Sequence, residues 1–429
     1  MPEHGSPGDG TIARLHREEH TRLLATLVRR FGDLDLAEDV AQEAMEAALR
    51  TWPESGVPDE PLAWLITTAK RRALDRVRRD AVYAQRLALL HIEQGARHAP
   101  AADQVTVDGP DGDRIPDDRL TMLLGCCHPA IAPADRVMLM LRFVGGLTTA
   151  EVAAALLVPV PTMQARITRA KRRIRGAGIP LTVPDDPEVL AARLPLVLTA
   201  VSLVFTEGYA ATSGEAPLRA ELTAEAIRLA RILHRSLPGE SEPAGLLALL
   251  LLTEARAPAR TDAAGAPVAL EDQDRGRWAR DLIAEGTALA ERAAVAGAGR
   301  FAVQAAIAAV HAEAATFAGT DWAQIVALYD LLLRLDPGPV VRMNRAVAVG
   351  RRDGFAEGLA LLDELGDEPE LVRHHPFHLA RALTLDRLGR TDEARVAYVR
   401  ALELVDNAGE RRFIRRRMDG EATGGDAPA

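Results

Sequence analysis

Cysteine is almost absent from this chain. Cys126 and Cys127 are the only cysteines among 429 residues, and they are adjacent. Two neighbouring thiols rarely close a disulfide, because the geometry is strained, and they supply no disulfide framework. His128 follows them, but three consecutive residues do not readily converge on one metal ion. We therefore interpret both cysteines as small, buried, apolar side chains.

Motifs of common enzyme chemistry are missing as well. The sequence contains no glycine-rich phosphate loop, no zinc-protease motif and no nucleophile elbow. The histidines of residues 374–378 could be taken for metal ligands, but Pro376 favours a turn with core histidines instead. An enzyme is the least supported class, and the sequence predicts no catalytic residue, no metal site and no cofactor.

Apolar runs of membrane-spanning length are not expected either. The longest runs, Leu194–Phe205 and Ala244–Thr253, are too short to cross a bilayer. The first residues lack the basic start and the apolar core of a secretory signal. We expect a cytoplasmic protein with no membrane partner, and its length favours two or three domains.

Basic residues are outnumbered by acidic ones, and the formal net charge is −9. Up to Pro180, however, 24 Lys and Arg balance 24 Asp and Glu, so the whole negative excess lies after this residue. Within the balanced part, cations cluster at Lys70–Arg79 and at Arg166–Arg175, with six in each cluster. Local clusters, rather than net charge, decide contact with nucleic acid. The chain therefore has two electrostatically different halves.

The segment Leu147–Arg175 predicts two short helices joined by a tight connection. In the second helix, apolar residues recur every three or four positions and share one face; they are Met163, Ile167, Ala170 and Ile174. The remaining faces carry Gln164, Arg166, Thr168, Arg169, Lys171, Arg173 and Arg175. A helix that packs by one side and exposes guanidinium groups elsewhere suits contact with phosphates. The alternative is an amphipathic surface helix whose arginines are only solvated.

A second helix, expected at about residues 36–51, carries an acidic stripe. Asp35 is expected as its N-cap, with Glu38 completing a capping box. Four polar side chains at offsets of zero, three, four and seven share one face; they are Asp39, Gln42, Glu43 and Glu46. Such a stripe is either a solvated face or a docking surface for a basic partner.

The helix expected at Leu62–Asp80 combines an aromatic residue with many arginines. It follows a loop expected at Trp52–Pro61. Trp64 beside arginines suits contact with unstacked bases and their phosphates. A tryptophan at a helix start is otherwise a half-buried anchor. The cations of this helix are Lys70, Arg71, Arg72, Arg76, Arg78 and Arg79.

The second half of the chain predicts only helices. Residues 96–119 are rich in Ala, Pro, Gly and Asp, which is typical of a flexible linker. Residues 190–418 show Ala/Leu-rich helical patterns, and near the end the spacing of Gly389, Ala394, Tyr398 and Ala401 is partly repeated 36 residues earlier. This period resembles tetratricopeptide repeats. The fold class is therefore all-α, with small helical domains at 12–95 and 120–178 followed by a helical-repeat domain.

The order of these motifs resembles that of a known family. Residues Gly32–Pro53 and Pro61–Asp80 resemble domain two of extracytoplasmic-function (ECF) bacterial sigma factors, and Leu147–Ile174 resembles their domain four. The resemblance covers residues 12–180 in the family's order. The appended helical half is similar to that of the ECF group with a C-terminal tetratricopeptide-like extension.

The resemblance implies partners and site residues. An ECF factor binds core RNA polymerase, through the clamp helices of the largest subunit and the flap region, and promoter DNA. The implied polymerase-binding residues are Asp39, Gln42, Glu43 and Glu46. Those implied for the −10 element are Trp64, Lys70, Arg71, Arg72, Arg78 and Arg79. Those implied for the −35 element are Thr162, Gln164, Arg166, Thr168, Arg169, Lys171 and Arg172.

Three residues of the helix pair depart from the family's pattern. Leu157 stands where the turn commonly has glycine, Pro161 replaces a glycine, and Gln164 replaces a frequent basic residue. Proline is tolerated at a helix start, because its missing N–H has no intrahelical partner there. The fold is therefore expected to persist, while the preferred bases are expected to differ.

Two other functions fit parts of the sequence. One is a protein-binding scaffold of helical repeats with a degenerate sigma-like half. The other is a helix-turn-helix repressor or activator, which leaves the acidic stripe and the helix at Leu62–Asp80 unexplained. In the sigma-factor hypothesis the C-terminal half modulates activity, through a protein partner or an intramolecular contact. It would cover a DNA or polymerase surface, or help to open the promoter.

Overall fold

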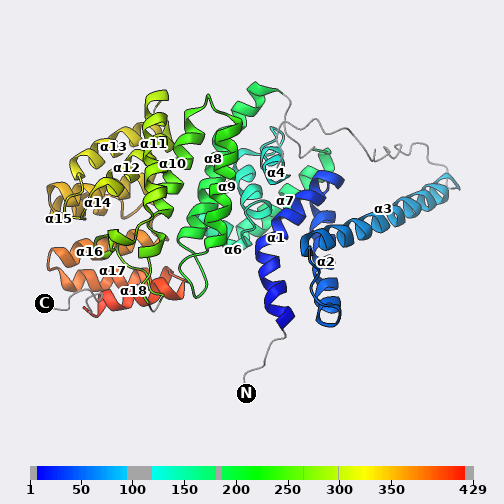
Figure 1. Ribbon diagram of the computed structural model, residues 1–429, viewed down its shortest axis with the longest axis horizontal. Coiled ribbons are helices and arrows are strands. Elements are labelled where there is room, and N and C mark those ends of the chain that lie inside the picture. Colours follow the sequence, from blue (N-terminus) through cyan, green and yellow to red (C-terminus); the bar gives the residue numbers. More distant parts are fainter. Residues whose placement is uncertain (1–6, 94–117, 180–185, 264, 298, 421–429) are drawn as a thin grey trace, which may run out of the picture. The chain divides into compact units, whose positions relative to one another are not determined.

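The computed structural model describes residues 7–93, 118–179, 186–263, 265–297 and 299–420 (Figure 1). Within these ranges the chain is helical without strands, apart from one isolated bridge between Thr261 and Pro267. The predicted all-α fold is confirmed. Most of the predicted linker, residues 96–117, lies outside the described residues, and its last two residues begin a helix.

Contacts within the chain define two compact units. The first contains Met1–Gly146 and Ala165–Val197, and the second contains Leu147–Gln164 and Leu198–Ala429. The division passes through two helices, α7 (Val160–Ala177) and α8 (Pro187–Tyr209). These units differ from the sequence-based domains, whose boundaries stay a prediction.

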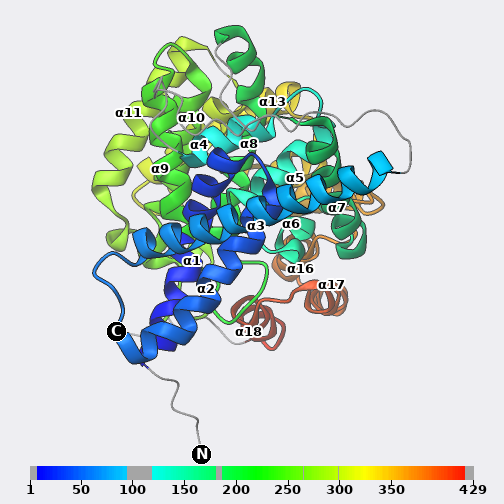
Figure 2. The same ribbon diagram turned by 90° about the vertical axis from the view of Figure 1, so that its right-hand side faces the viewer.

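The first unit is built on α1, which contacts the four helices α2, α3, α4 and α5 (Figures 1 and 2). Its complete helices are α1 (Pro7–Phe31), α2 (Leu34–Ser55), α3 (Pro61–Glu93), α4 (Asp118–Cys126) and α5 (Pro133–Phe143). Leu23, Leu24 and Leu27 of α1 are almost fully buried. Cys126 and Cys127 are buried too, as predicted, and burial raises the pKa of the Cys127 thiol to about 11. Both cysteines therefore stay protonated near neutral pH.

The start of α2 differs from the expectation. Asp33, not Asp35, is the N-cap: its carboxylate accepts the backbone N–H groups of Asp35 at 2.9 Å and Leu36 at 3.1 Å. The predicted capping box of Asp35 and Glu38 is therefore wrong, and these two carboxylates are available for other partners. The end also differs, since α2 continues through Trp52 and Pro53 to Ser55, which shortens the expected loop to residues 56–60.

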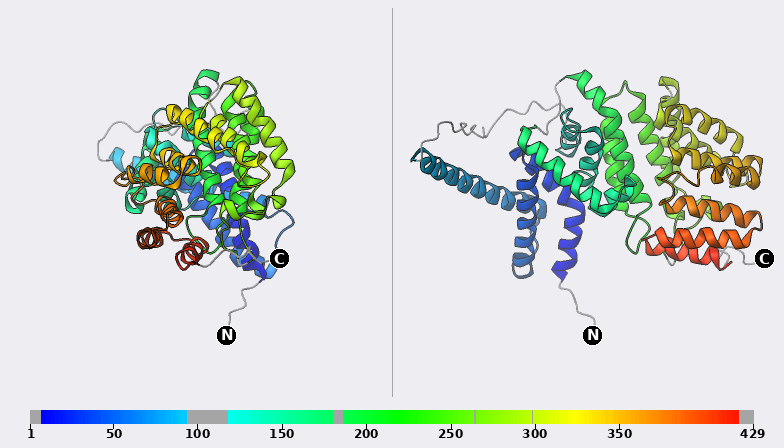
Figure 3. Two further views of the ribbon diagram at one scale, coloured as in Figure 1. Left: turned by 90° about the vertical axis from the view of Figure 1, so that its left-hand side faces the viewer. Right: turned by 180° about the vertical axis from the view of Figure 1, so that it is seen from behind.

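Most helices of the second unit pack against their sequence neighbours, and α10 also packs closely against α12 (Figure 3). Its complete helices are α6 (Thr149–Ala155), α9 (Ala220–Ser236), α10 (Ser241–Glu254), α11 (Arg280–Ala296), α12 (Arg300–Glu313), α13 (Trp322–Leu335), α14 (Pro339–Asp353), α15 (Phe355–Asp363), α16 (His375–Arg387), α17 (Thr391–Leu404) and α18 (Ala408–Met418). Three short 3₁₀ turns, Ala257–Ala259, Leu270–Asp272 and Arg275–Arg277, lie between α10 and α11.

Small residues allow close helix packing in this unit. A Cβ on Gly358 of α15 would lie 2.7 Å from the Gly350 Cα of α14, so larger side chains would separate these helices. The predicted repeat positions Ala394, Tyr398 and Ala401 are buried in α17. The histidine segment, predicted as a turn with core histidines, instead begins α16, with His374 as its N-cap and all three histidines half-buried. His378 Nε2 lies 2.9 Å from the Val372 carbonyl oxygen.

Helix α8 is more apolar than its sequence pattern indicated. Residues Glu188–Tyr209 form a helix long and apolar enough to cross a membrane, by length and composition alone, with 44% of its most apolar stretch buried. The expectation that no apolar run is long enough is therefore wrong, because moderately apolar residues extend the run Leu194–Phe205. Core helices of soluble proteins have the same length and composition, so this helix is weak support for a membrane span.

Candidate nucleic-acid interface

The acidic stripe of α2 lies on the surface of the first unit. Asp39, Gln42 and Glu46 are exposed, and Glu43 is half-buried. Two of its carboxylates are ion-paired to α3: Asp39 lies 2.7 Å from Arg76, and Glu43 lies 2.9 Å from Arg72. The side chain of Asp39 keeps 57% of its surface accessible. The stripe therefore remains open to a partner, although part of its charge is already neutralised.

The basic residues of α3 fall into two groups. Arg71, Arg78 and Arg79 are exposed, whereas Lys70 and Arg72 are half-buried. The exposed guanidinium groups are placed to approach a phosphate backbone.

Trp64 is an anchor in this structure. It is half-buried, and its ring meets the buried Trp52 edge to face, with ring centroids 5.4 Å apart. An aromatic pair of this geometry joins α3 to the end of α2. Stacking of Trp64 on a base, as the sequence suggested, would require part of this contact to be given up.

The helix pair at Leu147–Arg175 is present as predicted, formed by α6 and α7. Thr148 caps α6: its hydroxyl accepts the Glu151 N–H at 3.2 Å, and the Glu151 carboxylate accepts the Thr148 N–H at 2.7 Å. Leu157, at the glycine position of the turn, has a φ of +54°. This left-handed conformation is the one glycine adopts without strain, which accounts for the family's usual residue there.

The faces of α7 follow the predicted pattern. Met163, Ala170 and Ile174 are buried, and Ile167 is half-buried. Of the residues predicted to contact DNA, those with exposed side chains are Thr162, Gln164, Thr168, Arg169 and Arg172. Arg166 is instead half-buried, with a guanidinium nitrogen 3.1 Å from an Asp135 carboxylate oxygen. The exposed set offers hydroxyl, amide and guanidinium donors of the kinds that read bases and hold phosphates.

The second half of α7 is ion-paired to the first turns of α2. Lys171 contacts Asp35 and lies 2.6 Å from Glu38. Arg175 lies 3.2 Å from Asp33 and 2.5 Å from Asp35. All of these residues belong to the first unit. Three acids and two cations therefore form a cluster, which we call the α2–α7 cluster: Asp33, Asp35, Glu38, Lys171 and Arg175.

Burial and pairing act in opposite directions on this cluster. Partial burial lowers the pKa of Lys171, but hydrogen bonds to Asp35 and Glu38 outweigh it, so the pKa is raised. Burial raises the pKa of Asp33, yet hydrogen bonds from the Leu36 N–H and Arg175 bring it below the usual value. Lys171 and Asp33 are therefore both charged at neutral pH. Local sequence patterns did not indicate this cluster, because its acids lie more than 130 residues from its cations.

The second unit contains a further contact that the sequence did not indicate. Arg219, just before α9, donates to the Glu151 carboxylate of α6 at 2.8 Å. Arg373, before α16, donates to the Leu157 carbonyl oxygen at 3.0 Å. The C-terminal helices thus contact both the capping box of α6 and the turn of the helix pair.

Comparison with known proteins finds matches to two stretches of the chain. The Sigma-70 region 2 family matches residues 15–82, and the Sigma-70 region 4 family matches residues 121–174. The ECF RNA polymerase sigma factor SigK of Mycobacterium ulcerans is 31% identical over 36% of this chain and 79% of its own. SigK of Mycobacterium tuberculosis is 28% identical over 38% of this chain and 84% of its own.

The chain belongs to the ECF RNA polymerase sigma factors.

Membership of this family implies core RNA polymerase and promoter DNA as partners, and the family consists of non-enzymatic transcription initiation factors. Residues 193–294 match a family of unknown function, DUF6596. An uncharacterized protein of Rhizobium meliloti is 43% identical over 92% of both chains, so it shares the C-terminal half of this sigma factor. No solved structure matches the chain.

Proposed function

We propose that this sigma factor, acting in the cytoplasm, directs core RNA polymerase to a small set of promoters. The acidic stripe of α2 docks on the polymerase clamp helices, the cations of α3 hold the −10 region, and α7 enters the major groove at the −35 element. One observation carries this proposal: the side chains for two of these roles are exposed on helices whose opposite faces are buried. The work is done by binding free energy, since opening a promoter requires no covalent step.

Docking of the stripe is tested by exchanging an ion pair. The double substitution Asp39→Arg with Arg76→Asp keeps an ion pair between α2 and α3 but reverses the charge presented to polymerase. We expect affinity for core polymerase to fall by at least about tenfold, since charge reversal at a docking surface costs several kcal/mol. Helix content and melting temperature should stay near those of the parent.

The exchange leaves the net charge unchanged, so the control tests whether the position of the reversed charge matters. Glu54→Arg changes an exposed acid at the end of α2, outside the stripe, and should leave core binding intact. Equal core binding by the exchanged variant and the parent would show that Asp39 does not dock on polymerase.

The C-terminal helices modulate activity by holding the helix pair. Arg219 and Arg373 support this part of the proposal, because each contacts the region between Thr148 and Leu157. Glu151 is 7% exposed, so loss of Arg219 would leave a buried carboxylate without its cation. The orientation in which α6 is held then depends on the C-terminal half.

Point substitutions test this role more cleanly than truncation. A chain ending at Pro184 would also lose Arg193, whose guanidinium donates to the Leu124 carbonyl oxygen at 2.7 Å inside the first unit. We expect Arg219→Ala with Arg373→Ala to change promoter-specific transcription at least threefold, with core binding unchanged. Arg400→Ala, which removes an exposed pair within α17, is the matched control. Unchanged transcription in the double variant would contradict the proposal.

A further inference from the structure

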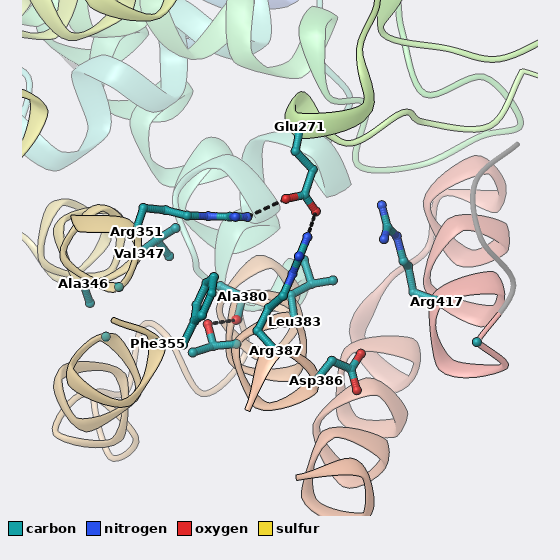
Figure 4. Close-up of a pocket in the computed structure, with 14 residues that line it drawn as sticks. Glu271, Ala346, Val347, Arg351, Phe355, Ala380, Leu383, Asp386, Arg387 and Arg417 are labelled. Carbon is teal, nitrogen blue, oxygen red and sulfur yellow. Dashed lines mark hydrogen bonds and ion pairs between the residues drawn. The ribbon is translucent and has the colours of Figure 1, made fainter. Parts of the chain in front are cut away.

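A cavity of about 300 Å³ lies among the last helices of the second unit. Its floor is apolar, formed by Ala346 and Val347 of α14, Phe355 of α15, and Ala380 and Leu383 of α16. The volume is at the lower end of the range for small-ligand pockets. Figure 4 shows that charged side chains surround this floor on several sides.

Three arginines from three different helices line the cavity. Arg351 comes from α14, Arg387 from α16 and Arg417 from α18. Among the described residues, two carboxylates, Glu271 and Asp386, line it with them. The described part of the lining therefore carries a net positive charge, although the chain after Pro180 has an excess of acidic residues.

The arginines already hold a carboxylate. The two oxygens of Glu271, from the short turn Leu270–Asp272, each accept one guanidinium, from Arg351 at 2.8 Å and Arg387 at 2.7 Å (Figure 4). Burial raises the pKa of Glu271, but the two arginines outweigh it and hold the pKa below its usual value. The cavity thus shows which chemical group its arginines recognise.

The guanidinium groups are held in place before any ligand binds. The guanidinium carbon of Arg351 lies 5.0 Å from the ring centroid of Phe317 and 5.2 Å from that of Phe355. Arg417 lies 5.5 Å from the centroid of Phe413 and pairs with Asp272 at 2.5 Å. Its buried Nε has no hydrogen-bond partner within the described part of the chain. This nitrogen has almost no accessible surface, so the donors that Arg417 can offer a ligand are its terminal nitrogens, which the aromatic contact and the ion pair hold in position.

We propose that this cavity is a binding site for a carboxylate carried on a short apolar stem. The stem lies on the apolar floor, and the carboxylate joins the arginines, in competition with Glu271. A free organic acid and an acidic peptide segment share this chemistry. The inference does not rest on the proposed function, because binding is measured without polymerase or DNA.

Titration calorimetry on the full chain tests the site. The probes are hexanoate, its uncharged analogue hexanamide, and the acetylated amide of Leu-Glu-Asp, which is the segment Leu270–Asp272. A fragment of this size is expected to bind with a dissociation constant on the order of 1 mM. Binding of hexanoate or the peptide, but not of hexanamide, supports the site. The tighter of the two binders identifies the source as a free acid or a peptide.

Two substitutions should change the affinity for the carboxylate in opposite directions, which a general loss of structure would not do. Glu271→Gln should tighten carboxylate binding several-fold, since it removes the competing charge. Arg417→Met should weaken binding at least about tenfold, as expected for removal of a charge-assisted hydrogen bond. Arg381→Met, on α16 but paired to Asp363 instead, should bind like the parent. Absence of saturable binding up to the solubility limit, or equal binding of hexanamide, would overturn the proposal.

Discussion

The ammonium group of Lys171 lies 2.6 Å from a carboxylate oxygen of Glu38, which links the middle of α7 to the second turn of α2. Lys171 is one of the residues that the family resemblance assigns to the −35 element. The same ammonium group cannot bind Glu38 and a DNA phosphate at full strength. In the role proposed for Lys171, promoter binding would therefore replace its ion pairs with phosphate contacts.

Removal of two acids from this cluster should strengthen DNA binding. In Asp35→Asn with Glu38→Gln, Lys171 loses both of its carboxylates, while Asp33 is kept because it caps α2. Partly exposed pairs contribute about 0.5 to 1 kcal/mol each, so the loss of both Lys171 pairs should raise affinity for duplex DNA roughly five- to thirtyfold. Fluorescence anisotropy with a random-sequence duplex at fixed salt measures the change.

The single substitution Glu54→Gln controls for the removal of negative charge, since Glu54 is exposed and lies outside the cluster. Its effect on DNA affinity should be smaller than that of either cluster acid alone. A cluster variant that binds DNA no better than this control would show that the ion pairs do not compete with phosphate.

Two exposed arginines of α7 should contribute directly to the salt dependence of DNA binding. Arg169 and Arg172 are exposed. Removal of one cation from a DNA phosphate reduces the slope of log K against log salt by about 0.9. Arg169→Ala and Arg172→Ala should each show such a reduction, with lower affinity. The control is Arg50→Ala, which changes an exposed arginine near the end of α2 and should keep the slope of the parent. An unchanged slope in the α7 variants would show that Arg169 and Arg172 do not contact DNA phosphates.

Leu157 should tolerate glycine better than valine. Its φ of +54° is unfavourable for residues with a Cβ, and most unfavourable for β-branched ones. Leu157→Gly loses a half-buried side chain but gains backbone freedom, so the free energy of unfolding should change by less than about 1 kcal/mol. Leu157→Val should be less stable than the glycine variant by about 1 to 2 kcal/mol. Thermal unfolding compares the two, and a more stable valine variant would contradict the left-handed turn.

The buried Glu207 should make the second unit less stable as the pH rises. The carboxylate is 3% exposed, and burial raises its pKa from the ordinary value of 4.5 to about 7. Below pH 4.5 the group is protonated in both the folded and the unfolded chain. As the pH rises toward 7, the unfolded chain gains by ionising while the folded chain does not, so stability falls, by an amount on the order of 3 kcal/mol once complete.

Glu207→Gln should remove this loss. The amide oxygen can still accept the Thr212 N–H and hydroxyl that Glu207 accepts at 3.0 and 3.1 Å. The variant should therefore unfold at a higher temperature than the parent at about pH 8 and at a similar temperature near pH 4.5. Glu215→Gln, whose side chain is 89% exposed, is the control. A parent and Gln variant with parallel pH profiles would show that Glu207 ionises normally.

The sequence predicted local features well, because they depend on spacing along one helix. The alternation of buried and exposed residues in α7 follows from its periodicity, and Asp39, Gln42 and Glu46 share one exposed face for the same reason. The glycine position of the turn, occupied by Leu157, also pointed to a real backbone feature.

Ion pairs between distant segments could not be predicted from the sequence. Nothing in the local pattern around Glu38 indicates that its partner is Lys171, because the pairing depends on how helices from distant segments pack. The same holds for Glu271, which reaches Arg351 and Arg387 from an irregular segment with little periodicity. The predicted N-cap of α2 was two residues too late. Asp33 and Asp35 are both favourable N-cap residues, so the sequence alone did not distinguish them.

Transcription with core RNA polymerase is the most direct test of the central claim. Fragmented genomic DNA would be transcribed by core enzyme alone, with the full-length protein, and with the variant Asp39→Arg plus Arg76→Asp, and the 5′ ends of the RNA would be mapped. The account predicts new start sites that require the protein, share a two-part upstream sequence and disappear with the variant. Identical start sites with and without the protein would contradict it.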